Sequence, residues 1–391
     1  MNKRKKLFFL LSRVPYPLEK GDKLRAFHQI KELSVQYDIY LCALSDKAVH
    51  ADAPNILNLY CKEIFIIKIS KAAILFNLIR NLFFSKLPLQ VAYFYFPFAK
   101  NKIEERLNQI KPDHIFCQLV RMSEYVKDLS IPKTIDYMDA LSRGMERRVN
   151  KAPFYLKPLL RIETRRLKLY EHDIFGFFEN RMIISEQDRN LIVHPENYKI
   201  HIIENGVDAE HFTPKEKSVK KYQLIFSGNM SYPPNIDAAK YLVKEIMPLV
   251  WKIKPNVKVA IAGANPTAEI KKLQSPFVEI TGWVENMADY YNASEIFVAP
   301  MQLGSGLQNK LLEAMAVGIP CITSDLVNNA LGAQQNKEIL IAQTTQEFAE
   351  KILLLLENKS VYYTIANNGR TFILSTYSWK KATEKMACLM N

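Results

Sequence analysis

Short apolar runs alternate with helix-like segments along the whole chain, and this alternation limits the folds available to it. In the first half, strands are expected over Leu7–Leu11, Ile39–Leu44, Glu63–Ile69, His114–Leu119, Lys133–Tyr137 and Arg181–Ile184. In the second half, they are expected over Tyr222–Phe226, Val257–Ala262, Val278–Thr281, Ile296–Ala299, Cys321–Thr323 and Ile339–Ile341. Strands that alternate with helices form parallel sheets covered by helices. The pattern therefore predicts an α/β protein with two doubly wound, Rossmann-like domains.

The chain has 391 residues, which is long for one core and sufficient for two. The pattern breaks near residues 201–221, where Pro214 and a run of lysines interrupt it. We therefore expect an N-terminal domain over 1–200 and a C-terminal domain over 201–375, facing each other across a cleft. The final helix, about 376–391, is expected to pack back on the first domain. Other helices are expected over Lys23–Val35, Lys102–Ile110, Asn235–Ile253, Pro266–Leu273, Met287–Ala293, Lys310–Val317 and Thr345–Asn358.

Positive charge is concentrated in the first half. Residues 1–200 contain 34 Lys and Arg against 22 Asp and Glu, whereas residues 201–391 contain 19 against 18. This asymmetry favours an anionic surface or acceptor as the partner of the first half, and an excess of solvated lysines is the alternative. Nucleic acid is not an expected partner, because no helix-turn-helix, zinc or base-stacking motif accompanies the charge.

Residues 68–100 combine an apolar, aromatic sequence with a basic rim. Aromatic residues gather between Phe83 and Phe98. The flanking basic residues are Lys68, Lys71, Arg80, Lys86 and Lys100. A helix and loop at a membrane interface have this composition, so peripheral membrane contact is expected. A core helix with a buried loop is the alternative. No stretch is long and apolar enough to span a membrane.

Five cysteines are scattered over the chain, and none forms a pair with zinc-site or redox-motif spacing. They are Cys42, Cys61, Cys117, Cys321 and Cys388. Their odd number and their spacing predict reduced thiols in a cytoplasmic protein.

The segment 300–320 is the most informative about function. Gly304 and Gly306 allow close approach of a ligand to the backbone, and the helix that follows offers unpaired N–H groups to an anion. Lys310 and Glu313 lie three residues apart and project from one face of that helix. A cation for phosphate beside a carboxylate for paired hydroxyls suits a nucleotide-sugar site.

Three stretches match a known family in order and spacing: the Asn205-Gly206-Val207-Asp208 region, residues 282–300 and residues 304–320. They resemble the retaining glycosyltransferases of family GT4, which have the GT-B fold. Residues 171–188 resemble the same family upstream. Residues 13–25 are similar to bacterial sugar transferases associated with exopolysaccharide loci. The resemblance covers most of the chain and is strongest over 200–325.

The resemblance implies a hexosyltransferase-type enzyme that moves a sugar, with retention, from a nucleoside-diphosphate-sugar donor. It implies that the donor binds the C-terminal domain and that the N-terminal domain binds a saccharide or lipid-linked acceptor for surface polysaccharide. No metal or other cofactor is expected, and the sequence contains no Asp-x-Asp and no cluster of metal ligands. The expected location is the cytoplasm, in peripheral contact with the inner face of the cell membrane.

The matching positions imply a donor site in which Glu313 contacts ribose hydroxyls and Lys310 contacts the diphosphate. The other donor-binding candidates are Gly228, Asn229, Gly282, Trp283, Val284, Gly304, Ser305, Gly306 and Leu307. The first glutamate of the family's Glu-x7-Glu motif falls at Ser305, and backbone amides of 304–307 are expected to replace it. Simpler interpretations are an exposed first-turn glutamate at Glu313, a turn residue at Asn229 and a core residue at Trp283.

In the first half, Lys20, Gly21 and Asp22 match the family's glycine loop near phosphate and acceptor, with an exposed basic turn as the alternative. Asp139 is a catalytic candidate that orients or deprotonates the acceptor hydroxyl, with a helix cap as the alternative. Further candidates for contacts to an anionic acceptor are Arg121 and Arg143.

Two other functions remain open from the sequence. The first is a GT-B-type nucleotide-sugar epimerase, which needs no acceptor. The second is a degenerate, non-catalytic nucleotide-sugar-binding protein, which the missing first glutamate at Ser305 allows.

Overall fold

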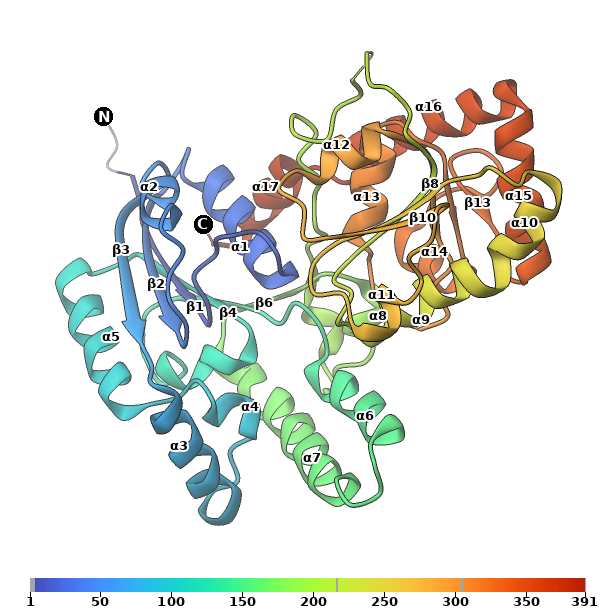
Figure 1. Cartoon of the computed structure of the whole chain (residues 1–391). Coiled ribbons are helices and arrows are strands. Elements are labelled where there is room, and N and C mark those ends of the chain that lie inside the picture. Colours follow the sequence, from blue (N-terminus) through green and yellow to red (C-terminus); the bar gives the residue numbers. More distant parts are fainter. Residues whose placement is uncertain (1–3, 216, 304–305, 391) are drawn as a thin grey trace. The chain divides into compact units, whose positions relative to one another are not determined.

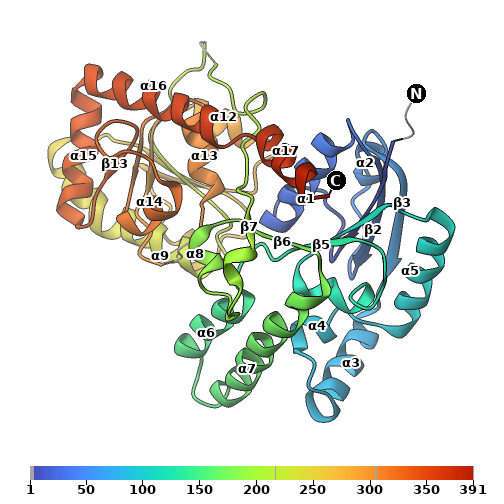
Figure 2. The ribbon, with the colours of Figure 1, turned by 180° about the vertical axis from the view of Figure 1, so that it is seen from behind.

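The computed structural model describes residues 4–215, 217–303 and 306–390. The chain divides into two compact units, one formed by Met1–Glu204 with Trp379–Asn391 and the other by Asn205–Ser378. Figures 1 and 2 show the ribbon from two sides. The division after Glu204 lies close to the expected boundary at residue 200. The final helix α17 (Trp379–Met390) belongs to the first unit, where it packs on α1 (Gly21–Leu33).

The N-terminal unit contains a seven-stranded sheet in the order β3-β2-β1-β4-β5-β6-β7, with every neighbouring pair parallel. Its strands are β1 (Lys6–Leu11), β2 (Asp38–Ser45), β3 (Cys61–Lys68), β4 (His114–Gln118), β5 (Lys133–Asp136), β6 (Asn180–Ile183) and β7 (His201–Ile202). The strand order reverses between β1 and β4. In parallel sheets, ligands bind beyond the carboxyl ends of the strands at such a switch point.

Hydrophobic cores lie on both faces of this sheet. Phe8 and Leu10 of β1 join one core, whereas Leu7, Phe9 and Leu11 join the other. The helices of this unit, besides α1 and α17, are α2 (Ala53–Leu57), α3 (Lys71–Phe84), α4 (Leu89–Ala92), α5 (Pro97–Ile110), η1 (Val120–Tyr125), α6 (Leu141–Lys151), α7 (Lys157–Asp173), η2 (Ile174–Phe177), α8 (Glu186–Arg189) and η3 (Asn197–Lys199). Apolar residues on alternate sides of β1 therefore hold helices against both faces, as a doubly wound sheet requires.

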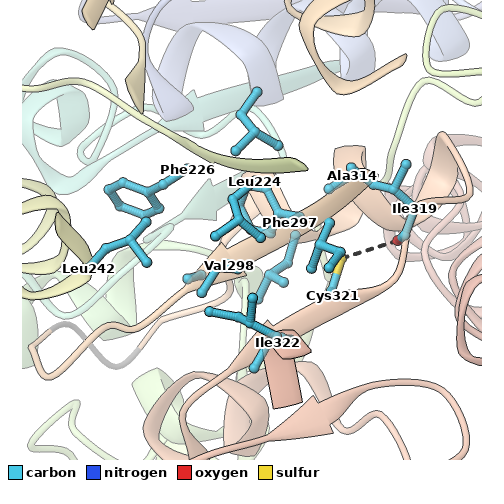
Figure 3. Close-up of a cluster of buried hydrophobic side chains, with 14 of the residues drawn as sticks. Leu224, Phe226, Leu242, Phe297, Val298, Ala314, Ile319, Cys321 and Ile322 are labelled. Carbon is cyan, nitrogen blue, oxygen red and sulfur yellow. Dashed lines mark hydrogen bonds between the residues drawn. The ribbon is translucent and has the colours of Figure 1, made fainter. Parts of the chain in front are cut away.

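The C-terminal unit contains a six-stranded parallel sheet in the order β10-β9-β8-β11-β12-β13. Its strands are β8 (Tyr222–Ser227), β9 (Val259–Ala262), β10 (Val278–Gly282), β11 (Ser294–Ala299), β12 (Cys321–Thr323) and β13 (Leu340–Ile341). Its helices are α9 (Pro233–Tyr241), the π-helix η4 (Leu242–Ile246), α10 (Met247–Ile253), α11 (Ala268–Lys271), α12 (Met287–Asn292), α13 (Asn309–Ala316), α14 (Asp325–Leu331), α15 (Thr345–Glu357) and α16 (Lys359–Thr376). Figure 3 shows part of its core, where Leu224, Phe297 and Ile322 from three adjacent strands cluster.

The prediction of two doubly wound α/β domains is confirmed. Every expected strand is present, with its ends shifted by two residues or fewer. Strand β7 was not predicted, because it is two residues long and lies where the apolar pattern breaks. Among the described residues, no helix is both long and apolar enough to cross a membrane.

A buried ion pair ties α1 to the end of β5 in the N-terminal unit. Arg25 and Asp136 are both 0% exposed, and the Arg25 Nε atom lies 2.6 Å from the Asp136 Oδ2 atom. The Gln29 amide donates to the same oxygen at 3.3 Å, and the Met138 N–H donates to Oδ1 at 3.0 Å. These bonds hold α1 at the carboxyl edge of the sheet, where the candidate residues of this unit lie.

We predict that Asp136→Ala lowers the free energy of unfolding of the protein by about 3–5 kcal/mol, because it leaves the Arg25 charge buried without its carboxylate. Chemical denaturation monitored by circular dichroism measures the change. Glu269→Ala, which breaks an exposed ion pair with Lys240, is the control and should leave the midpoint unchanged. A loss no larger than that of the control would contradict the structural role of the pair.

Candidate functional site

The candidate donor residues of the C-terminal unit follow the carboxyl ends of its parallel strands. Gly228 comes directly after β8, Gly263 after β9, and Gly282 ends β10. Met301 follows β11 and precedes α13, which contains Lys310. Because all these strands are parallel, the residues lie at one edge of the sheet.

Two glycine turns approach each other at this edge more closely than side chains would allow. Gly263 has φ +136°, and a Cβ on it would lie 1.9 Å from the carbonyl oxygen of Gly228. Gly228 has φ +152°, and a Cβ there would lie 2.6 Å from the Asn235 Nδ2 atom and 3.2 Å from the Lys310 Nζ atom. Both turns therefore require glycine. Gly263 was missed at the sequence level, where its position after a strand was the only indication.

Lys310 is held at this edge by three contacts. Its Nζ atom donates to Asn235 Oδ1 at 2.6 Å, lies 3.9 Å from the Met301 sulfur, and lies 4.7 Å from the centre of the Phe226 ring. Burial lowers the pKa of Lys310 to about 7, against the opposing effect of Glu313. A bound anion would supply the missing counter-charge and favour the protonated form.

Glu313 lies one turn further along α13 and is partly buried. Its Oε2 atom accepts a hydrogen bond from the Tyr291 hydroxyl at 2.9 Å, and that hydroxyl also lies 2.7 Å from Ser227 Oγ. Burial raises the pKa of Glu313 to about 7, although the Tyr291 hydrogen bond and Lys310 act in the opposite direction. The interpretation of Glu313 as an exposed first-turn glutamate is therefore wrong. Tyr291, which positions the carboxylate, was not identified as a site residue from the sequence.

The remaining donor candidates differ in exposure and in their hydrogen bonds. Trp283 is 66% exposed, so its interpretation as a core residue is wrong. It follows Gly282 (φ +68°), and its neighbour Val284 is partly buried. The Asn229 side chain accepts hydrogen bonds from the Ser231 N–H and hydroxyl, as a turn residue does.

The loop before α13 is described only in part. Gly306 and Leu307 are partly buried, and Leu307 packs against the core of this unit. The predictions for Gly304 and Ser305 lie outside the described residues.

The candidate acceptor residues of the N-terminal unit also follow the carboxyl ends of strands. The stretch Lys20, Gly21 and Asp22 lies at the start of α1, after β1, and Arg121 lies in η1 after β4. Asp22 forms an ion pair with Arg13, which precedes it in the same connection. Arg13 also lowers the pKa of Lys20 and of Arg121, in each case after the larger effect of burial.

These effects place Arg13, Lys20, Asp22 and Arg121 in one charged cluster. Lys20 and Gly21 are exposed, and nothing lies within 4 Å of a Cβ built on Gly21. The local packing therefore gives no reason for a glycine there. Arg143 instead pairs with Glu146 within α6. Arg13, the additional cation, lies in the stretch 13–25 that is similar to bacterial sugar transferases, but the sequence alone does not assign it a role.

Asp139 follows β5 at the same sheet edge, and its side chain is exposed. Desolvation, and after it the carboxylate of Asp188, raises the pKa of Asp139 to about 6, whereas Arg121 lowers it. The residue does not cap α6, because the cap position is Ala140 and the helix begins at Leu141. The helix-cap interpretation is therefore wrong. A carboxylate that titrates near neutrality can accept a proton from a hydroxyl.

No group of three or more His, Cys, Asp or Glu side chains in the described parts of the chain is arranged to hold a metal ion. Activity without a metal or other cofactor stays a prediction.

The close approach of the two glycine turns gives a testable consequence. Gly263→Ala should lower the melting temperature markedly, because the new methyl group would overlap the Gly228 carbonyl. Gly332→Ala is the matched control, since Gly332 also has a positive φ (+70°) but has nothing within 4 Å of its Cβ position. Equal losses in the two variants, measured by calorimetry, would mean that backbone strain alone accounts for the effect.

Known proteins are similar to this chain in one unit or over most of its length. Residues 221–358 match the family model described as glycosyl transferases group 1. An uncharacterized 44.6 kDa protein in the cps region of Klebsiella pneumoniae is 24% identical over 96% of this chain and 97% of that protein. The UDP-Gal:alpha-D-GlcNAc-diphosphoundecaprenol alpha-1,3-galactosyltransferase of Escherichia coli is 26% identical over 51% of this chain and 55% of that enzyme.

Among solved structures, WaaG, a glycosyltransferase involved in lipopolysaccharide biosynthesis, aligns with a TM-score of 0.68 at 14% identity over 98% of this chain and 99% of WaaG. At this identity the likeness establishes the fold alone. The residues around Lys310 and Glu313 lie inside the part that matches the group 1 family. Together these findings support a glycosyltransferase with the GT-B fold.

Proposed function

We propose that this protein is a retaining, hexosyltransferase-type glycosyltransferase of surface polysaccharide biosynthesis. The donor is a nucleoside-diphosphate-sugar, and the acceptor is a saccharide or a lipid-linked saccharide. One observation carries the proposal: Lys310 and Glu313 project from the first turns of α13 at the carboxyl edge of the second sheet, within the part that matches group 1 glycosyl transferases.

In this proposal the two side chains bind opposite parts of the donor. The Lys310 ammonium and the free N–H groups at the start of α13 bind the diphosphate, and the Gly228 turn allows the phosphates to approach the backbone. The Glu313 carboxylate, positioned by Tyr291, accepts hydrogen bonds from two ribose hydroxyls. Backbone groups of Gly282 and Val284 contact the base, beside the exposed ring of Trp283. The Escherichia coli relative is named for a UDP-sugar donor, so we propose UDP as the nucleotide.

Cleavage of the bond between the sugar and the diphosphate leaves negative charge on the departing phosphate. Lys310 in its protonated form neutralises this charge, and the oriented N–H groups of α13 add to the effect. No metal is required in this scheme. The GT4 family has a glutamate at the position that Ser305 occupies here. In this proposal, backbone groups of the loop before α13 contact the sugar hydroxyls instead.

We propose that the N-terminal unit binds the acceptor at the carboxyl edge of its own sheet. Arg13, Lys20 and Arg121 form the cationic part of that site and suit a diphosphate-bearing acceptor. Asp139 orients the acceptor hydroxyl and accepts its proton. The name of the Escherichia coli relative states an acceptor linked to diphosphoundecaprenol, which supports this choice. Such an acceptor would place the protein in the cytoplasm at the inner face of the membrane, where segment 68–100 makes the contact.

Neither a nucleotide-sugar epimerase nor a non-catalytic binder is favoured by these findings. An acceptor-dependent product separates the proposed enzyme from both, because an epimerase changes the donor without acceptor and a binding protein makes no product.

We predict that Lys310→Ala and Glu313→Gln each lower kcat/KM for transfer by about 100-fold or more, because each removes a preorganised charge from the donor site. The assay measures hexose transfer from UDP-hexose to a short-chain, diphosphate-linked saccharide in metal-free buffer. Matched controls are Lys271→Ala and Glu269→Gln, two exposed positions in the same unit, which should leave the rate unchanged. Wild-type rates in either site variant would rule out the assigned donor site.

The lowered pKa of Lys310 predicts that UDP affinity depends on pH. Since the pKa in the free protein is about 7, the ammonium loses its proton as the pH rises above that value. UDP binding must then include proton uptake, and the dissociation constant should rise by up to about tenfold per pH unit between about pH 7 and pH 9. In Lys310→Arg the guanidinium stays charged, so this rise should vanish. Calorimetric titration at several pH values measures it, and a flat wild-type profile would contradict the role of Lys310.

A further inference from the structure

Helix α3 exposes five large apolar side chains to solvent, whereas Ile74 is buried in the core, Leu78 packs against that core and two side-chain amides are buried. The exposed side chains are Leu75, Phe76, Ile79, Phe83 and Phe84, with exposed fractions of 52–86%. Asn77 and Asn81 on the other side are each 5% exposed. An amphipathic helix on a core turns most of its large apolar side chains inwards, whereas five of those in α3 face outwards.

Buried hydrogen bonds fix this orientation of α3. The Asn77 side-chain amide donates to the carbonyl oxygens of Ala92 at 2.5 Å and Tyr95 at 2.8 Å. The Asn81 amide donates to the Asn77 carbonyl at 2.8 Å and to its side-chain oxygen at 2.9 Å. The Asn81 bonds lie within α3, so rotating the helix to bury its phenylalanines would break the Asn77 bonds to Ala92 and Tyr95. It would leave those buried polar groups unsatisfied, which is costly. The exposed apolar face is therefore a stable feature of the fold.

A second exposed apolar group lies at the turn between α6 and α7. Phe154 and Tyr155 are 84% and 66% exposed. Helix α7 is bonded to α3, since the Arg166 guanidinium donates to the carbonyl oxygens of Asn81 at 3.3 Å and Leu82 at 3.2 Å. Both views show the C-terminal end of α3 and the α6–α7 turn on the same, lower side of the N-terminal unit (Figures 1 and 2). The two apolar groups can thus meet one surface.

Positive charge predominates in the two segments that contain the apolar groups. Segment 68–100 contains five Lys or Arg and no Asp or Glu, and segment 141–173 contains nine basic residues against four acidic ones. Between α6 and α7 lies a cavity of about 550 Å³ that Arg161, Arg165 and Lys168 line, together with Glu146, which pairs with Lys168 at 3.3 Å. Neither Arg161 nor Arg165 forms a salt bridge with any residue that the structure describes. The cavity therefore offers unpaired cations next to an apolar tip.

We propose that α3 and the α6–α7 turn form a two-point docking surface for an anionic lipid bilayer. Phe83, Phe84, Phe154 and Tyr155 enter the interfacial layer, where aromatic rings are favoured. The cavity between α6 and α7 holds the phosphate of a lipid headgroup. An anionic bilayer fits better than a protein because the surface combines exposed rings with an extended positive rim and little negative charge.

This inference deepens the peripheral membrane contact proposed above. It adds the α6–α7 hairpin as a second insertion point and names anionic phospholipid as the partner. Because lipid binding needs no nucleotide-sugar, it can be tested without the donor site.

Co-sedimentation of the full chain with vesicles tests the docking surface. The protein should pellet with phosphatidylcholine vesicles that contain phosphatidylglycerol, should stay in solution with phosphatidylcholine alone, and should be released by salt. Three paired variants should each weaken partition by about tenfold or more: Phe83→Ser/Phe84→Ser, Phe154→Ser/Tyr155→Ser and Arg161→Gln/Arg165→Gln. Two matched pairs in the C-terminal unit, Val219→Ser/Tyr363→Ser and Lys271→Gln/Lys272→Gln, should bind as the wild type does.

Several results would overturn the proposal. The first is a wild-type protein that does not pellet with anionic vesicles. The second is a variant of α3 or of the α6–α7 turn that pellets as the wild type does. The third is a wild-type protein that is a dimer without lipid and that these variants convert to a monomer. The last result would make a second copy the occupant. UDP-induced thermal stabilisation of the same samples shows that each variant is folded. It also separates the docking surface from the proposed donor site. A variant that loses vesicle binding but still binds UDP shows that the donor site does not depend on the docking surface.

Discussion

The close approach between the Gly228 and Gly263 turns is the constraint on which the candidate donor site depends. The Gly228 carbonyl occupies the space that a side chain on Gly263 would need, and the missing side chain of Gly228 leaves room for Asn235 and Lys310. Asn235 in turn bonds both the Asn229 carbonyl and the Lys310 ammonium, at 2.9 Å and 2.6 Å. The position of the Lys310 ammonium thus depends on two residues without side chains.

Burial at this edge of the sheet shifts the pKa values of Lys310 and Glu313. Burial lowers the pKa of the lysine and raises that of the glutamate, and each value reaches about 7. Burial thus works against the charged form of both groups in the unliganded protein. A ligand with a diphosphate and vicinal hydroxyls supplies a partner for each, so binding such a ligand favours the charged forms. A site built in this way discriminates against ligands that lack either group.

Much of the fold could be predicted from the sequence because parallel strands buried on both faces are continuous apolar runs. Prediction was weaker where a short element or a local exception occurs. The helix expected over Asn235–Ile253 contains a π-turn at Leu242–Ile246, before Pro248, whose missing N–H interrupts regular helical bonding. Segment 68–100 is mixed in its exposure, because α3 exposes its rings whereas Phe94 and Phe96 are buried, and its contact with a membrane stays a prediction.

The candidate site shows the same division. Lys310 and Glu313 could be identified because their motif is local in sequence. Tyr291, Asn235 and Gly263 come from other strand connections, and only the fold brings them to α13. In the N-terminal unit, the sequence does not reveal a role for Arg13, because its pairing with Asp22 depends on how the loop after β1 turns back on α1.

The most direct test of the central claim is calorimetric titration of the full chain with UDP, GDP, ADP and dTDP in metal-free buffer. The account predicts saturable binding of UDP at one site per chain, and loss of that binding in Glu313→Ala with an unchanged melting temperature. Binding of none of the nucleotides, or equal UDP affinity in Glu313→Ala and in the wild type, would contradict it.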